Sequence, residues 1–132
     1  MNSLSGQISN IEVSGSLSLV SIQIKDTTFK AIVIENPNTS LYLKVDKPVK
    51  IFFKETEVII TTTKIDMISL ENQISGIVTT FEKGKLLTKI TIDTYLGVIN
   101  SIITSASFKK LGIKEGSNVI TMIKTNEVVL GK

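Results

Sequence analysis

The second half of this chain of 132 residues matches its first half at a fixed shift of 70 positions, without a gap. Self-similarity of this kind indicates a duplicated structural unit. Matches between apolar residues arise easily by chance in a chain rich in Ile, but these matches cover several chemical types: Asn2 with Asn72, Gly6 with Gly76, Leu17 with Leu87, Lys54 with Lys124, and Glu57 with Glu127. We therefore predict two similar modules, residues 1–65 and residues 66–132.

Both copies show the alternation of apolar and polar residues that is typical of β-strands with one buried face. In the first copy the expected strands cover residues 6–13, 17–25, 29–34, 49–54 and 58–62. In the second copy they cover residues 76–81, 86–94, 98–104, 119–124 and 128–130. Many of the apolar residues are Ile and Val, which suit a pleated sheet better than a helix.

One short helix is expected between the third and fourth strands of each copy. In the second copy Ser107 is a suitable N-cap, and Gly112 is a suitable stop after Leu111. Five short strands with a small helix at this place are typical of an OB-like barrel. The sequence thus predicts an all-β protein of two tandem OB-like β-barrel modules, each with one short helix.

The residue types that are missing exclude several kinds of chemistry. The chain has no Cys, no His and no Trp. Disulfides, zinc sites with thiolate or imidazole ligands, cysteine nucleophiles and Ser-His-Asp triads are therefore excluded. The Asp residues are scattered and form no calcium-binding loop. We expect a protein that is not an enzyme and that holds no metal cation.

The charged and aromatic residues argue against nucleic acid as a partner. All 15 basic residues are Lys, so the chain has no guanidinium to clamp phosphate or to read guanine, and the net charge is only +3. The two Tyr and five Phe are dispersed rather than gathered as a stacking surface. No apolar run reaches the length of about 18 residues that a membrane span needs. We expect a cytoplasmic protein without a membrane or nucleic-acid partner.

Small hydrogen-bond donors gather towards the end of the second copy. Thr104 and Ser107 surround the expected helix start, and Thr125 and Asn126 follow Lys124 at the end of a strand. Hydroxyl and amide donors near one ammonium would suit a small oxyanion. On their own, Thr104 is also an ordinary strand residue, Ser107 an ordinary helix cap, and Lys124 an ordinary edge residue.

The second copy resembles the Mop, or TOBE, module of molybdate-binding proteins. The residues that carry this resemblance are Asn72-Gln73-Ile74-Ser75-Gly76, Ile102-Ile103-Thr104 with Ser107, Leu111-Gly112-Ile113-Lys114-Glu115-Gly116, and Ile123-Lys124-Thr125-Asn126-Glu127-Val128. A tandem pair of such modules is similar to the di-Mop molbindins. The resemblance implies cytoplasmic storage or homeostasis of molybdenum, with molybdate or tungstate as the ligand, no organic cofactor, and a homo-oligomer, most often a trimer.

The resemblance also implies oxyanion sites at the interfaces between modules. The residues that it suggests as contacts are Lys124, Thr104, Ser107, Thr125, Asn126, Ser69 and Lys54. The family motif Ser-Ala-Arg-Asn is Ser69-Leu70-Glu71-Asn72 here, so an acidic residue replaces the Arg. In the first copy Ile34 and Pro37 stand where the second copy has Thr104 and Ser107. An alternative is therefore a degenerate module that acts as an oligomeric interaction or regulatory domain without an anion site of its own.

Overall fold

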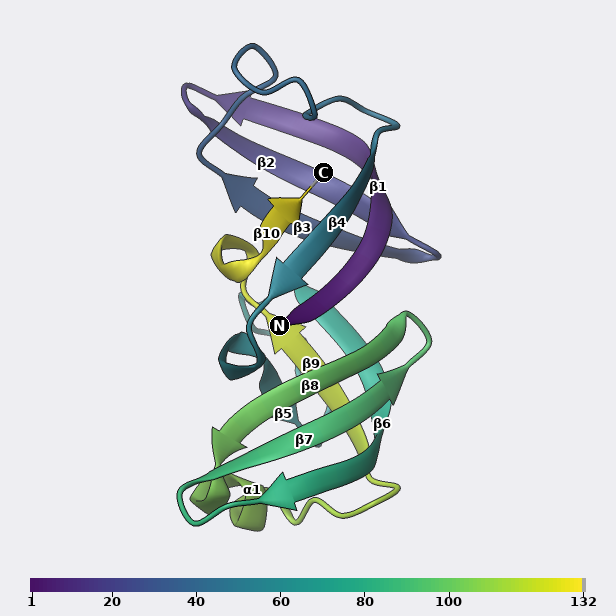
Figure 1. Cartoon of the computed structure of the whole chain (residues 1–132), viewed down its shortest axis with the longest axis vertical. Helices are drawn as coiled ribbons and strands as arrows, with labels where there is room; N and C mark the ends of the chain where they lie inside the picture. The colour runs from purple at the N-terminus through teal and green to yellow at the C-terminus, as the bar shows by residue number, and fades with distance from the viewer. Residues whose placement is uncertain (132) are drawn as a thin grey trace.

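The computed structural model describes residues 1–131 as two five-stranded, strongly curled sheets stacked along the long axis of the molecule (Figure 1). The first copy contains β1 (Asn2–Ser14), β2 (Leu17–Ile24), β3 (Thr27–Val33), β4 (Pro48–Phe53), the 3-10 turn η1 (Glu55–Glu57) and β5 (Ile59–Thr61). The second contains β6 (Asn72–Lys83), β7 (Leu87–Thr94), β8 (Gly97–Thr104), α1 (Ser105–Leu111), β9 (Asn118–Ile123), the 3-10 turn η2 (Thr125–Glu127) and β10 (Val129–Gly131). The predicted all-β class and OB-like modules are confirmed.

The two copies exchange their last strands. The order in one sheet is β10-β4-β1-β2-β3, and in the other it is β5-β9-β6-β7-β8. β10 at the end of the second copy pairs antiparallel with β4, while β5 of the first copy pairs antiparallel with β9. Each sheet is thus completed by a strand from the other copy. The division at residues 65 and 66 stays a prediction of where the repeats divide the sequence.

The hydrophobic core runs across the junction between the two sheets. Alternate residues of β2 are buried, as the sequence pattern predicts, and they pack with residues of β1, β3 and β4. The same cluster includes Ile74, Ile99 and Ile123 from the second copy. The modules are therefore packed directly on each other, and the segment that connects them, residues 62–69, is exposed.

Two buried asparagines lock the modules together in a reciprocal way. The Asn2 Nδ2 donates to the Asn100 carbonyl at 2.8 Å, and the Asn100 N–H donates to Asn2 Oδ1 at 2.7 Å. Asn72 makes the same pair of bonds with the backbone of Lys30, at 2.9 and 2.7 Å. Each amide side chain therefore satisfies one N–H and one C=O on the outer edge of the other module's sheet.

The N-cap of helix α1 lies three residues earlier than predicted. Thr104, not Ser107, is the N-cap, because its backbone is extended and its Oγ1 accepts the Ser107 N–H at 3.1 Å. The predicted end is confirmed, since Gly112 adopts the left-handed conformation at φ 65° that favours glycine at this position.

The first copy has no equivalent helix, so the prediction of one helix in each module is wrong for residues 1–65. Ile34 offers no oxygen to cap a helix, and Pro37 has no N–H for a cap to bind. The loop of residues 34–47 is held instead by Glu35, which accepts hydrogen bonds from the Tyr42 hydroxyl at 2.7 Å and from Ser40. Burial, together with this carboxylate, raises the pKa of Tyr42 to about 12.

The buried hydrogen bonds of Asn72 predict a large loss of stability when this one side chain is truncated. Asn72→Ala leaves the Lys30 N–H and C=O without partners at a half-buried place, so we expect a loss of about 1–3 kcal/mol in the free energy of unfolding. Asn10→Ala is the matched control, because Asn10 is exposed on β1. Urea unfolding of both variants measures the difference, and equal stabilities would contradict the role of the lock.

Because Thr104 is the cap, substitutions of Thr104 and of Ser107 should have different effects on stability. Thr104→Val keeps the side-chain shape but removes the acceptor, and we expect it to cost about 1 kcal/mol of stability. Ser107→Ala keeps the N–H that Thr104 accepts, so its stability should stay within about 0.5 kcal/mol of the wild type. Denaturant unfolding and far-ultraviolet circular dichroism measure both variants. If Ser107→Ala were the more destabilised of the two, the assignment of Thr104 as the cap would be wrong.

Candidate functional site

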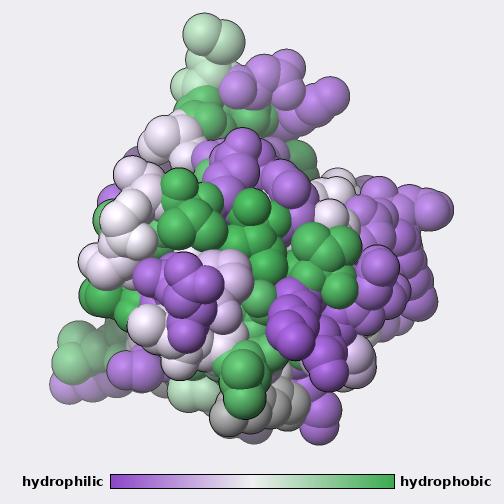
Figure 2. All heavy atoms as spheres, turned by 90° about the horizontal axis from the view of Figure 1, so that it is seen from above, coloured by the Kyte–Doolittle hydropathy of each residue, from purple (hydrophilic) through white to green (hydrophobic). Residues whose placement is uncertain are grey.

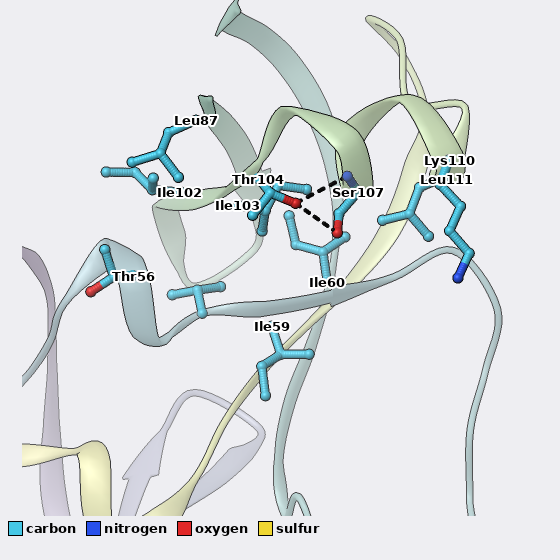
Figure 3. Close-up of a pocket in the computed structure, with 11 residues that line it drawn as sticks. Thr56, Ile59, Ile60, Leu87, Ile102, Ile103, Thr104, Ser107, Lys110 and Leu111 are labelled. Carbon is cyan, nitrogen blue, oxygen red and sulfur yellow. Dashed lines mark hydrogen bonds between the residues drawn. The ribbon is translucent and has the colours of Figure 1, made fainter. Parts of the chain in front are cut away.

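An open cavity of about 560 Å³ lies where the end of the first copy crosses the second module. Its floor and walls are largely apolar, and its lining comes from η1 and β5 on one side and from β7, β8 and α1 on the other (Figure 3). The lining residues that carry polar side chains are Thr56, Thr104, Ser107 and Lys110. The cavity exists only because β5 joins the sheet of the other copy.

The hydroxyls of Thr104 and Ser107 point towards each other at the edge of this cavity (Figure 3). Thr104 Oγ1 accepts the Ser107 N–H and donates its own proton to Ser107 Oγ at 2.9 Å. Because the Ser107 oxygen is the acceptor in that bond, its proton remains to be donated outwards. Hydrogen bonds in such a chain polarise one another, which strengthens Ser107 as a donor.

Two further hydroxyls hold the walls of the cavity in place. Ser101 is fully buried, and its Oγ donates to the Val58 carbonyl at 2.9 Å, which attaches the first copy's last segment to β8. Ser105 Oγ donates to the Gly84 carbonyl at 2.7 Å and lies 2.9 Å from Thr88 Oγ1. These bonds fix both the η1 side of the cavity and the start of α1.

Lys110 supplies the cationic group of the cavity. It follows Ser107 by three residues, so both lie on the same face of α1, with the ammonium at the rim (Figure 3). Lys110 was not among the predicted contacts, although its spacing of three residues from Ser107 on one helix is a signal that would have found it. Thr56 lies across the cavity on η1, and its hydroxyl points away from the Thr104 and Ser107 pair in Figure 3.

No carboxylate is among the described residues that line the cavity. Glu55, next to Thr56, is turned to the amino group of Met1 at 3.0 Å. The pKa of Glu55 is lowered, chiefly by a hydrogen bond from its own backbone N–H and next by the hydrogen bond from the Met1 amino group. The cavity therefore combines hydroxyl donors and one ammonium without an acidic side chain that would repel an anion.

The other predicted contacts lie elsewhere in the chain. Lys124, Thr125 and Asn126 lie at the start of η2, which packs against β3 of the first module. Lys54 and Asn126 face a small cavity of about 190 Å³ between the two 3-10 turns, which Glu57 and Glu127 also line. Ser69 is exposed in the segment before β6.

Within one chain the structure thus brings Thr104 and Ser107 together but places Lys124 elsewhere. The strand exchange is the reason, because it brings the 54–58 segment of the first copy, and not the 124–128 segment of the second, against β8. Sequence proximity within a repeat could not reveal this exchange.

The part of the chain that the structure describes contains no group of three or more acidic, His or Cys residues placed to hold a metal ion. Among the same residues, no helix has the length and apolar character needed to cross a membrane.

Known proteins resemble this chain both in sequence and in fold. A family model described as the TOBE domain matches residues 68–130. Molybdenum-pterin-binding protein 1 of Clostridium pasteurianum is 34% identical over 64 residues, which cover 48% of this chain and 94% of that relative. The crystal structure of the cytoplasmic molybdate-binding protein ModG with molybdate bound matches with a TM-score of 0.91 at 28% identity, over 98% of this chain and 94% of that one.

The sequence likeness covers the second copy, and the structural likeness extends to both copies and to their arrangement. A relative with this identity, matched along almost its whole length, is sufficient to assign the family. The chain belongs to the Mop/TOBE family of molbindins.

Proposed function

We propose that this protein binds molybdate or tungstate reversibly in the cytoplasm and serves the storage or homeostasis of molybdenum. The observation that carries the proposal is the pair of hydroxyls of Thr104 and Ser107, which open into a cavity that has Lys110 at its rim and no acidic lining residue. The match of 98% of the chain to a structure with molybdate bound supports the same ligand.

The donors of the cavity suit the chemistry of a tetrahedral dianion. Each oxygen of such an anion accepts hydrogen bonds, and the chain has no Arg, so the donors must be single N–H and O–H groups. A neutral donor contributes about 0.5–1.5 kcal/mol and a charged donor about 1.5–3 kcal/mol. The Ser107 hydroxyl and the Lys110 ammonium together would contribute about 2–4.5 kcal/mol, so a Kd of about a micromolar needs further donors from a neighbouring chain. The proposal is binding and release without chemical change and without an organic cofactor.

We also propose that the protein is a homo-oligomer, with a trimer favoured. Exposed apolar side chains recur at equivalent positions of the two copies: Leu17 and Leu87 are 45% and 55% exposed, and Ile59 and Val129 are 47% and 58% exposed. Figure 2, a view from the end of the first module, also shows hydrophobic side chains gathered among polar ones on that face. Apolar surface of this kind is typical of subunit interfaces.

Leu87 and Ile59 also line the cavity. A second copy packed there would close the cavity and exclude water from the anion. Lys54, Lys124, Thr125, Asn126 and Ser69 stay predicted oxyanion contacts that would act from the junctions between modules. The alternative, a module without an anion site, fits the first copy's Ile34 and Pro37 but not the intact hydroxyl pair of the second copy.

Calorimetry of the full chain with molybdate, tungstate and sulfate tests the proposed binding. We expect heat with molybdate or tungstate, and a Kd raised about threefold to tenfold by Ser107→Ala, which removes one neutral hydrogen bond. Lys110→Ala should also weaken binding, most strongly at low salt, because its ammonium is at the exposed rim.

Lys109→Ala is the matched control for Lys110→Ala, since it removes the same charge from the same helix but does not line the cavity. Equal losses in the two lysine variants would show a general charge effect rather than a site. The absence of heat and of thermal stabilisation with all three anions would contradict the proposed function.

Analytical ultracentrifugation tests the oligomer. We expect the mass of three chains, and we expect Leu87→Glu to shift it towards one chain, because a buried unpaired carboxylate opposes association. Asn38→Glu is the control, since it adds the same charge on an exposed loop. A wild-type sedimentation mass of a single chain at micromolar concentration would exclude the oligomer.

A further inference from the structure

The chain contains two junctions of the same backbone design. η1 packs against β8, and η2 packs against β3, so each 3-10 turn meets the outer strand of the other copy's sheet. The first junction carries the hydroxyls of Thr104 and Ser107. At the second, the equivalent positions are Ile34 and Pro37, which have no side-chain donor.

The second junction has a feature that the first lacks. Lys30 on β3 places its Nζ 3.4 Å from Glu71 Oε2. The position equivalent to Lys30 in the other junction is the neutral Asn100. The first junction also has an ion pair, between Glu55 and the amino group of Met1 at 3.0 Å, but Met1 is the position equivalent to Glu71, so a cation stands there where the second junction has a carboxylate.

The backbone holds this carboxylate in place. Glu71 directly precedes Asn72, whose buried amide makes two hydrogen bonds to the backbone of Lys30. Both charged side chains are partly exposed, at 39% and 54%. The buried hydrogen bonds of the Asn72 side chain to the Lys30 backbone nevertheless keep the two residues close together. The Glu71 carboxylate is thus tethered next to the Lys30 ammonium, with the high effective concentration that a short tether gives.

The strand register places a second lysine, Lys124, opposite Glu71. The antiparallel register pairs Asn72 with Ile123, so the next two residues outwards are Glu71 and Lys124. Residues opposed in this way have Cα atoms about 5 Å apart. Lys124 has no ion pair of its own among the residues that the structure describes. Glu71 is therefore paired with Lys30 of the first module and follows the strand register opposite Lys124 of its own module.

We infer that the Glu71 carboxylate is a built-in occupant of the second junction. A carboxylate is itself an oxyanion, and here it takes the place beside Lys30 that a free anion would need. A dianion that approached this junction would meet a tethered like charge and a Lys30 ammonium that is already neutralised in part. The two junctions therefore differ in function: the one at Thr104 and Ser107 is open to an oxyanion, and the one at Glu71 is closed to it.

This inference rests on the proposed function of the first junction, but it makes a separate prediction. Glu71→Gln keeps the shape of the side chain and removes the charge, so Lys30 becomes available to an added anion and the negative charge opposite Lys124 is lost. We expect calorimetry with molybdate to show one more bound anion per chain than in the wild type. We also expect molybdate to raise the thermal midpoint of the variant more than that of the wild type at constant ionic strength.

Glu115→Gln is the matched control, because it makes the same charge change at an exposed turn that has no ion pair among the described residues. The double variant Glu71→Gln with Ser107→Ala should keep the added site, which separates it from the cavity at α1. If Glu71→Gln and Glu115→Gln behave alike in stoichiometry and in thermal shift, the inference is overturned. A wild type that binds no anion would contradict the proposed function instead, while the difference between the two Gln variants would still decide the role of Glu71.

Discussion

The exchange of the last strands is the constraint on which the rest of the molecule depends. A sheet edge left open presents unpaired N–H and C=O groups, and here β5 and β10 cover one edge each, in the sheet of the other copy. The same crossing carries η1 onto β8 and so creates the cavity that holds Thr104 and Ser107. The reciprocal bonds of Asn2 and Asn72 then fix how the two sheets meet.

Duplication gave this chain two junctions with one backbone design, and the side chains have made them chemically different. In one, a threonine caps a helix and directs a serine hydroxyl into a cavity. In the other, Ile34 and Pro37 cannot support a helix, and the loop is organised around the Glu35 carboxylate instead. The charged side chains follow the same division, since the Lys30 and Glu71 pair is present at only one junction.

The repeat and the period-two alternation were sufficient to predict most strands, because a strand with one buried face alternates apolar and polar residues. The exchange could not be predicted, because β5 and β10 have only three residues each and no pattern states which edge they join. For that reason Lys124 was grouped with Thr104. The cap was assigned to Ser107 rather than Thr104 because both residues are good caps, and only the backbone conformation distinguishes them. Lys110 was not among the predicted contacts, because a lysine on a short helix is most often an ordinary solvated residue.

The interleaving also has a consequence for the order in which the protein can fold during synthesis. The first sheet needs Val129–Gly131 to cover β4, so it cannot be completed until these residues have left the ribosome. Contacts between such distant residues are slow to form. Until then the uncovered edge of β4 is open to strands of other chains. A chaperone that shields this edge, or slow dilution during refolding, should therefore raise the yield of folded protein more for this chain than for two barrels that each close on their own strands.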